Sequence, residues 1–234
     1  MIVAPVRAAR AVPGWLLLGA LSFFLLPWYF LADQSVLASL PGVFGAPETA
    51  SGAVQALRHG RPWLWIGCAG LALAALGGGM PAGARQGRVL LFGAGLGLTG
   101  LLLSGFTIGA KGWSFAWIEQ SFGVLAVGQF GIGLGGALTL LSLLMLLAAG
   151  LARLGYFRGD FFVAGAVLGC AALLLLFIAL PVLNALAGAF LNETGDMALA
   201  SLAERIGNQR VWGLACLASS ARCGAAWNTL FLAL

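Results

Sequence analysis

Residues 120–152 contain no Asp, Glu, Lys or Arg, and this uncharged stretch limits the possible folds more than any other feature of the chain. A helix needs about 20 apolar residues to cross a bilayer, so the stretch is longer than one span. Only 8% of the chain is charged and 61% is hydrophobic, whereas a soluble domain has about 25% charged residues. A soluble fold of this size would leave much of that apolar surface in water. The sequence therefore predicts an all-α integral membrane protein.

Charged residues divide the chain into about five apolar runs, and we predict a transmembrane helix in each. The runs cover residues 15–31, 62–80, 89–108, 132–152 and 161–182. Together they predict a five-helix transmembrane segment over residues 1–190. The Gly-rich residues 120–131 are expected to be irregular or interfacial, and residues 52–59 to form a short surface helix.

The first apolar run has a second interpretation, because a basic start followed by an apolar stretch also fits a signal peptide. No clear cleavage site of small residues follows it. Pro27, Trp28 and Tyr29 near its end are typical of an interfacial belt. These two observations favour an uncleaved first transmembrane helix.

Residues 191–226 form the longest polar region, which we predict to be an extracytoplasmic loop. Asp196 caps an expected amphipathic helix over residues 197–206, whose apolar face suits the membrane surface. Residues 227–234 are apolar again, but as a helix they rise only about 12 Å against a hydrocarbon core of about 30 Å. We expect them to be the truncated start of a sixth transmembrane helix, the alternative being a terminal anchor in the interface.

The orientation follows from where basic residues lie, since short Arg-bearing loops stay in the cytoplasm. With alternate loops on opposite sides, six of the 12 basic residues fall on each side, so a count does not decide. One set lies in short segments directly beside helices: Arg7, Arg10, Arg85, Arg88, Arg153 and Arg158. Six of the seven acidic residues lie on the other side. We therefore predict a cytoplasmic N-terminus in a multi-pass protein whose main partner is the lipid bilayer.

No pattern in the sequence indicates an enzyme. The only histidine, His59, lies between Arg58 and Arg61 in a loop and is interpreted as a solvated side chain. Neither a second histidine nor paired carboxylates are present to complete a metal site or an acid–base pair, so we predict no catalytic residue, metal ligand or cofactor. The basic residues are scattered without interleaved aromatics, which argues against nucleic-acid binding. Charge is also absent from the centres of the apolar runs, which disfavours a proton pump.

The 36 glycines suggest close helix packing rather than nucleotide binding. Gly93 and Gly97, and likewise Gly131 and Gly135, are four residues apart, so each pair is expected to share a helix face that another backbone can approach. The segment GIGLGG at residues 131–136 loosely resembles a nucleotide fingerprint. That fingerprint requires a preceding strand, which this sequence does not predict.

The four cysteines fall into two groups. Cys68 and Cys170 lie inside apolar runs and are predicted to be packing residues. Cys216 and Cys223 share the last polar loop, where an oxidising compartment would permit a disulfide. A turn across residues 218–221 would bring their Cα atoms within the roughly 4.4–6.8 Å that a bridge requires, whereas a continuous helix would hold them about 10 Å apart. We predict the Cys216–Cys223 disulfide, with two free thiols as the alternative.

One family resemblance is carried mainly by residues 210–234, which read RVWGLACLASSARCGAAWNTLFLAL. This segment resembles part of the proteobacterial binding-protein-dependent ABC transporter permeases of the iron(III) type. Segments that agree in character are LLPWYFLADQSVL at 25–37, KGWSF at 111–115 and GYFRGDFFVAG at 155–165. In such permeases two permease-like units form the translocation path, and a cytoplasmic loop with an EAA-type motif docks the ATPase. This sequence has no such loop, so no functional residue of the family is transferred to it.

The resemblance implies the N-terminal portion of an import permease, without its ATPase-coupling loop, in a bacterial inner membrane. Its implied partners are an ABC ATPase subunit and a periplasmic binding protein, both acting through the rest of the permease. The alternative is a non-transporting membrane scaffold or assembly protein whose Gly-rich helices bind partner helices. The expected cargo, iron, follows from the resemblance alone, because the sequence contains no cluster of residues suited to iron(III).

Overall fold

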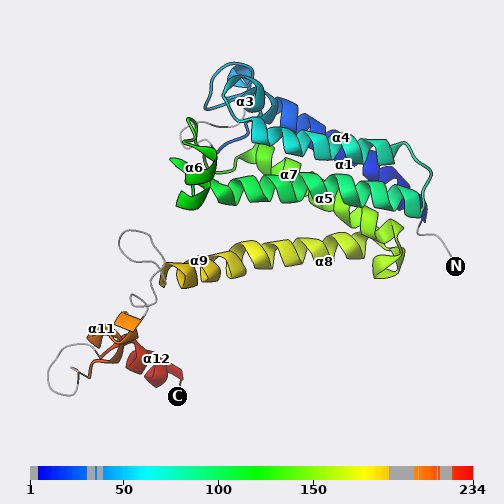
Figure 1. The fold of residues 1–234 in the computed structure, drawn as a ribbon. Coiled ribbons are helices and arrows are strands. Elements are labelled where there is room, and N and C mark those ends of the chain that lie inside the picture. Colours follow the sequence, from blue (N-terminus) through cyan, green and yellow to red (C-terminus); the bar gives the residue numbers. More distant parts are fainter. Residues whose placement is uncertain are drawn as a thin grey trace. The chain divides into compact units, whose positions relative to one another are not determined.

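The computed structural model describes residues 5–30, 35, 39–189, 203–204, 206–214, 216 and 223–233. The chain is mostly helical, in agreement with the predicted fold class at this coarse level. It divides into two compact units, Met1–Gly169 and Cys170–Leu234, and each unit is described by itself. Figure 1 gives the order of the elements along the chain.

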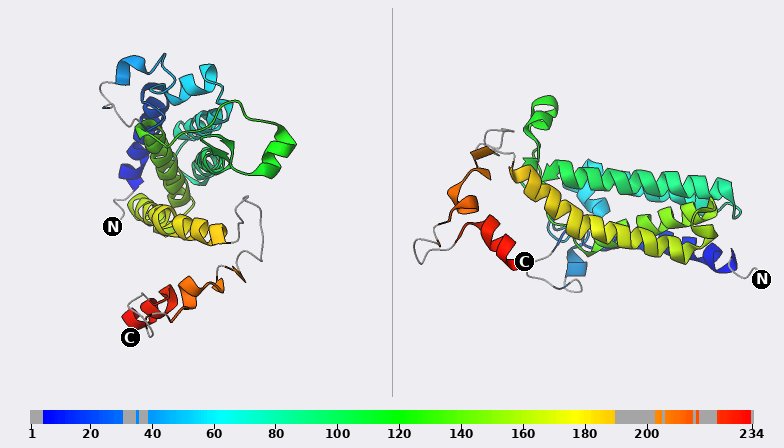
Figure 2. Two further views of the ribbon diagram at one scale, coloured as in Figure 1. Left: turned by 90° about the vertical axis from the view of Figure 1, so that its left-hand side faces the viewer. Right: turned by 90° about the horizontal axis from the view of Figure 1, so that it is seen from below.

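The first unit is built on a bundle of α1 (Pro5–Leu25), α4 (Trp65–Gly78), α5 (Ala84–Thr107) and α7 (Leu134–Arg153). The views in Figure 2 agree with Figure 1 that these blue, cyan and green helices run side by side. Their shared core contains Phe23, Leu71, Leu90, Leu143 and Leu146, all of which are buried. Each helix contributes apolar residues to this core at helical spacing, which is why the four elements close on one another.

Glycine lets two of these helices approach closely. A Cβ added at Gly70 on α4 would lie 2.5 Å from the Cα of Gly97 and 2.8 Å from the carbonyl oxygen of Gly93, both on α5. The predicted packing face of Gly93 and Gly97 is therefore confirmed. The second predicted pair is wrong, because α7 begins only at Leu134 and Gly131 lies before it.

Short elements connect the helices of the first unit. They are η1 (Leu40–Gly42), α3 (Gly52–Arg58), η2 (Pro62–Leu64), strands β1 (Ile108–Gly109) and β2 (Gly112–Trp113), α6 (Ala116–Phe122) and η3 (Tyr156–Gly159). The strands form an antiparallel hairpin in which Ile108 pairs with Trp113. The predicted helix at residues 52–59 exists as α3, but one face of it is buried rather than lying on the surface.

Three helices in the described part of the chain are long and apolar enough to cross a membrane: Ala84–Thr107, Leu134–Arg153 and Phe161–Leu183. They coincide with the third, fourth and fifth predicted spans. The helices of the first two predicted spans have shorter apolar stretches, Ala11–Leu25 and Pro62–Gly78. Membrane-length helices are thus observed, and the count of five spans stays a prediction.

The end of the first predicted span differs from the prediction. The helix stops at Leu25, and residues 26–30, which we call the strap, are not helical. Pro27 explains the stop, because a proline disfavours helical geometry in the residue before it. Trp28 and Tyr29 are each only 2% exposed, so the interpretation of these aromatics as an interfacial belt is wrong. They pack into the core instead of facing a membrane boundary.

The helix that starts at Phe161 changes geometry near its middle. It runs as α8 (Phe161–Leu174), then as the π-helical segment η4 (Leu175–Ala179), and continues as α9 (Leu180–Ala189). A proline ring clashes with the carbonyl four residues earlier, and for Pro181 that carbonyl belongs to Phe177 in η4. The wider π turn makes room for the ring without ending the helix.

In the second unit, the elements after α9 are α11 (Gln209–Trp212) and α12 (Ala225–Ala233). Most of the predicted amphipathic helix at 197–206, including its cap Asp196, lies outside the described residues. The predicted start of a sixth transmembrane helix, residues 227–234, lies in α12 as far as Ala233. Leu230, Phe231 and Leu232 of α12 are exposed. Whether α12 enters a membrane stays a prediction.

Candidate functional site

A buried arginine lies at the end of the first unit where α3 and η2 meet. Arg61 is only 4% exposed. The chain turns sharply before it, since Gly60 has φ +67° and Pro62 starts η2. The Nε of Arg61 donates to the carbonyl oxygen of Gly128 at 3.0 Å, and its Nη1 donates to the side-chain oxygen of Gln55. Arg61 thus joins two segments that are 67 residues apart in the sequence.

Two aromatic rings complete the surroundings of this guanidinium. Its Cζ lies 4.9 Å from the ring centroid of Tyr29 and 5.3 Å from that of Phe130. The two rings meet edge to face, with centroids 5.6 Å apart. A guanidinium over a ring face is attracted by the ring's negative charge distribution, and the attraction is strongest where water is excluded. We call Tyr29, Gln55, Arg61 and Phe130 the arginine cluster.

The electrostatics of the arginine cluster are unusual because its charge has no carboxylate partner among the described residues. Burying an unpaired charge is costly unless hydrogen bonds replace the lost water. Here a carbonyl oxygen, an amide oxygen and two rings take that role. The tyrosine hydroxyl is neutral at physiological pH, so the cluster keeps the net positive charge of Arg61.

The strap brings Tyr29 to Arg61 through backbone pairing with the Gly-rich segment before α7. The N–H of Phe30 donates to the Gly131 carbonyl at 2.8 Å, and the N–H of Gly133 donates to the Trp28 carbonyl at 2.9 Å. A Cβ at Gly133 would clash with the carbonyl of Tyr29. The glycines of GIGLGG therefore serve a close approach between two stretches of irregular backbone, not a nucleotide.

The sequence did not reveal the arginine cluster. Arg61 was interpreted as a loop charge and Tyr29 as interfacial, yet both are buried. His59 was interpreted as solvated, but it is half-buried, and its Nε2 has no hydrogen-bond partner among the described residues. The only local signal was Pro62 after Arg61, which indicates a fixed turn. The described residues contain no group of three His, Cys, Asp or Glu side chains placed to hold a metal ion.

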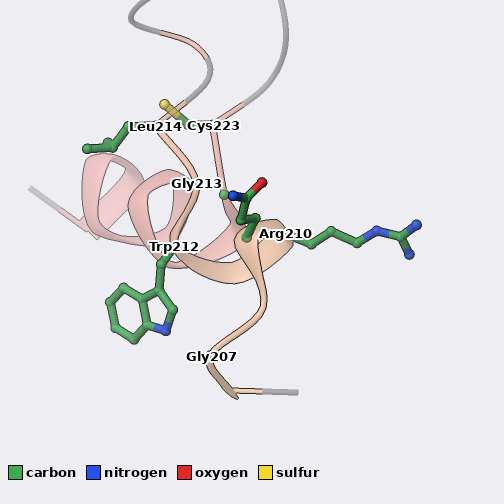
Figure 3. Close-up of a pocket in the computed structure, with 8 residues that line it drawn as sticks. Gly207, Arg210, Trp212, Gly213, Leu214 and Cys223 are labelled. Carbon is green, nitrogen blue, oxygen red and sulfur yellow. The ribbon is translucent and has the colours of Figure 1, made fainter. Parts of the chain in front are cut away.

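The second unit carries an open pocket of about 610 Å³, shown in Figure 3. It is lined by Gly207, Gln209, Arg210, Trp212, Gly213, Leu214, Cys223 and Gly224. In Figure 3 the side chains of Arg210 and Trp212 point away from each other. The lining has a single charged side chain and neither a nucleophile with a base nor paired carboxylates.

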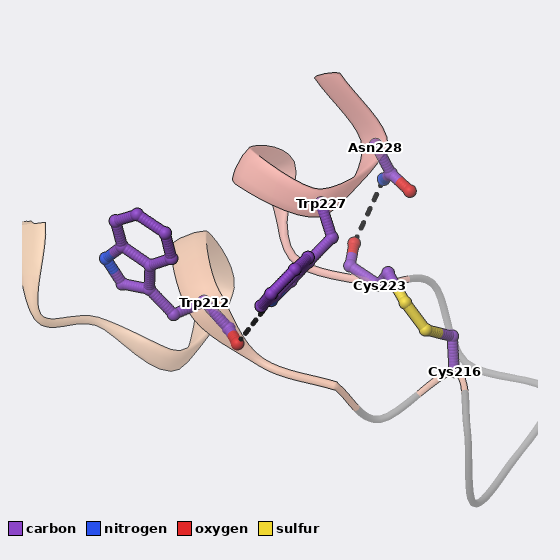
Figure 4. The surroundings of a disulfide bond; sticks show 5 residues. All are labelled: Trp212, Cys216, Cys223, Trp227 and Asn228. Carbon is purple, nitrogen blue, oxygen red and sulfur yellow. Dashed lines mark hydrogen bonds between the residues drawn. A yellow bond between two sulfur atoms is a disulfide. The ribbon is translucent and has the colours of Figure 1, made fainter. Parts of the chain in front are cut away.

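Cys216 and Cys223 lie beside this pocket and are joined by a disulfide in the structure, with Cα atoms 4.8 Å apart. This separation is within the range that a bridge requires, and the turn expected at residues 218–221 lies outside the described residues. Figure 4 shows two hydrogen bonds nearby: Trp227 donates from Nε1 to the carbonyl of Trp212 at 3.0 Å, and Asn228 donates from Nδ2 to that of Cys223 at 3.0 Å. The first bond holds α12 against α11, and the second ties the first turn of α12 to the disulfide-bonded Cys223. Oxidation of the pair in the cell stays a prediction.

The other two cysteines differ from each other. Cys68 on α4 packs against the core of the first unit, as predicted. Cys170 on α8 is exposed, so its predicted packing role is wrong within this chain. Cys170 is exposed because a long apolar helix carries hydrophobic residues on all its sides, and the rest of the chain covers only some of them.

Comparison of the chain with known protein families, curated proteins and solved structures found no match. The similarity of residues 210–234 to iron(III)-type permeases therefore stays a resemblance.

Proposed function

We propose that this chain is a membrane component of a binding-protein-dependent ABC import permease of the iron(III) type, inserted in a bacterial inner membrane. Its partners are then an ABC ATPase subunit and a periplasmic binding protein. The observation that carries the proposal is the combination of membrane-length helices with residues 210–234, the segment that resembles these permeases.

The placement of basic residues supports an orientation with the N-terminus in the cytoplasm. Arg85 and Arg88 lie exposed in the first turns of α5. A Cβ added at Gly87 would lie 2.9 Å from the Cβ of Arg153 at the end of α7, so both basic turns share one end of the bundle. Short Arg-bearing turns resist translocation. That shared end is therefore the cytoplasmic one in our proposal.

The finer proposal is that α1 and α4 also cross the bilayer, which with α5, α7 and the helix from Phe161 makes five spans. Both short helices pack in the same bundle as two membrane-length helices (Figure 1). The apolar stretch Ala11–Leu25 of α1 rises about 22 Å as a helix, so the residues of the strap would have to complete a path through a hydrocarbon core of about 30 Å. The strap buries Pro27, Trp28 and Tyr29, and η2 buries Leu64, whereas Phe30 and Pro62 are exposed.

A deletion of the gene in its native host tests the proposed function. Loss of uptake of radiolabelled iron(III), together with co-purification of an ABC ATPase on the tagged protein, is the expected result. Addition of the iron-loaded periplasmic binding protein should stimulate ATP hydrolysis by the purified complex. Unchanged iron uptake in the deletion strain would contradict the proposal, and a complemented strain provides the control.

A non-transporting scaffold is the second candidate, and the structure gives a reason to rank it lower. A scaffold of the kind considered would expose its small-residue faces to partner helices. Gly70, Gly93 and Gly97 instead contact each other's helices, and Gly87 faces Gly150 on α7. These close-approach faces are used inside the chain. Co-purification of other membrane proteins without any ATPase would favour the scaffold.

A further inference from the structure

Four aromatic side chains gather just beyond the end of α5, in the hairpin and α6. The ring centroids of Trp113 and Phe122 are 6.2 Å apart, and those of Phe115 and Trp117 are 6.4 Å apart. The indole N–H of Trp113 donates to the carbonyl of Gly123 at 2.9 Å, which ties the end of α6 to the hairpin. We call Trp113, Phe115, Trp117 and Phe122 the aromatic cluster.

The outer side of the aromatic cluster is not covered by the described part of the chain. Trp117 is 63% exposed and Phe122 is 77% exposed. On the helical wheel, Trp117, Ile118 and Phe122 occupy one arc of α6, while Glu119 and Gln120 occupy the opposite arc. Ile118 is buried and fixes α6 to the unit. Trp117 and Phe122 thus lie on either side of the buried Ile118, at the two borders of the apolar arc, and both stay exposed.

The length of α5 sets the depth at which this edge would lie in a membrane. Its 24 residues rise about 36 Å, slightly more than the hydrocarbon core of about 30 Å. No charged residue occurs between Arg88 and Lys111. With Arg88 in the headgroup region on one side of the membrane, Lys111 reaches the headgroup region on the other side. The hairpin and α6 follow directly, so with α5 inserted in this way they would lie at headgroup level and not in the surrounding water.

We propose that the aromatic cluster inserts into the lipid interface, with Trp117 and Phe122 against the acyl-chain boundary and Glu119 toward water. Indole and phenyl rings favour this depth because each presents a large apolar body, and the indole also carries a polar N–H. Leu103 and Phe106 on the last turns of α5 are exposed as well. The proposal rests on insertion of α5 in a membrane and not on transport.

Site-directed spin labelling of the whole chain in liposomes tests this placement. The four native cysteines are replaced by alanine, and a nitroxide is attached to Trp117→Cys, Phe122→Cys or, as the matched control on the polar arc, Glu119→Cys. Labels at 117 and 122 should collide more often with oxygen, which concentrates in lipid, than with a water-soluble nickel complex. The label at 119 should show the reverse order. Water-like accessibility at both 117 and 122 would overturn the proposal.

Trp117→Phe gives a second measurement on a chain that keeps its cysteines and its ring packing. The fluorescence lost in this variant isolates the signal of Trp117. Lipids brominated near the headgroup should quench that signal more than lipids brominated deep in the acyl chain. Quenching by aqueous iodide alone would overturn the proposal.

In the spin-label experiment, labels at 117 and 122 that are shielded from both oxygen and nickel would also overturn the proposal, since that pattern indicates a protein partner.

Discussion

Gly93→Ala on α5 should destabilise the chain although alanine is the better helix former. The new Cβ would lie 2.5 Å from the backbone nitrogen of Ala74 and 3.0 Å from the carbonyl oxygen of Gly70. Both contacts are with backbone on α4, so no side-chain rotation relieves them, and the helices must separate. Overpacking costs about 1–3 kcal/mol, against a gain of about 1 kcal/mol in helix propensity.

Gly105→Ala is the matched control on the same helix, because a Cβ there meets nothing within 4 Å. It should keep the propensity gain of about 1 kcal/mol, which separates the two variants by about 1–3 kcal/mol. Unfolding in mixed micelles by increasing fractions of sodium dodecyl sulfate, followed by circular dichroism, measures the difference. Equal stabilities of Gly93→Ala and Gly105→Ala would refute the packing argument.

Four further outcomes follow from the structure. Arg61→Ala should cost about 1–3 kcal/mol for each of the two oxygens left without a donor, with Arg61→Lys losing less, in the same micelle assay. Asp160→Ala should cost about 1 kcal/mol, because its carboxylate caps the start of α8. Alkaline phosphatase fused after Gln86 should be inactive, and high activity would reverse the orientation. Alkylation without reductant should leave Cys216 and Cys223 unmodified in protein from an oxidising compartment, and modification of both would exclude the bridge.

The long helices were predictable because hydropathy is a local property of the chain. The predicted spans at 132–152 and 161–182 differ by only one or two residues from the membrane-length helices Leu134–Arg153 and Phe161–Leu183. The span predicted at 89–108 is observed as α5, which begins earlier, at Ala84. Long arginine side chains at a helix end reach water while their backbone stays helical, so a charge does not mark where a helix begins.

The strap and the arginine cluster were not predictable because both depend on contacts between distant segments. Trp28 and Tyr29 have the composition of an interfacial belt, and contacts with distant segments, among them Ala50 and residues 131–135, bury them. Arg61 has the composition of a loop charge, and only Gly128 and Gln55 supply its acceptors. A single sequence reports how apolar a residue is. It does not report which distant carbonyl will replace water.

The arginine cluster also bears on where the bundle ends in a membrane. Irregular backbone is stable at membrane depth only where protein or water satisfies its polar groups. The strap meets this condition through bonds such as that from Trp28 to the Ala50 carbonyl at 3.1 Å, and Arg61 closes the same region with side-chain bonds. Gln129 follows Gly128, the backbone acceptor of Arg61. The backbone N–H of Gln129 donates to the carbonyl of Gly109, which lies just beyond the C-terminal end of α5, whereas Arg85 lies at the N-terminal end. Arg61 is buried at this end of α5, whereas Arg85 at the start of α5 and Lys111 in the turn after β1 are both exposed. Burial and pairing with the Gly128 carbonyl and the Gln55 side chain make Arg61 part of the fold, so a count of basic residues that includes it overstates the charge able to orient the chain at that end.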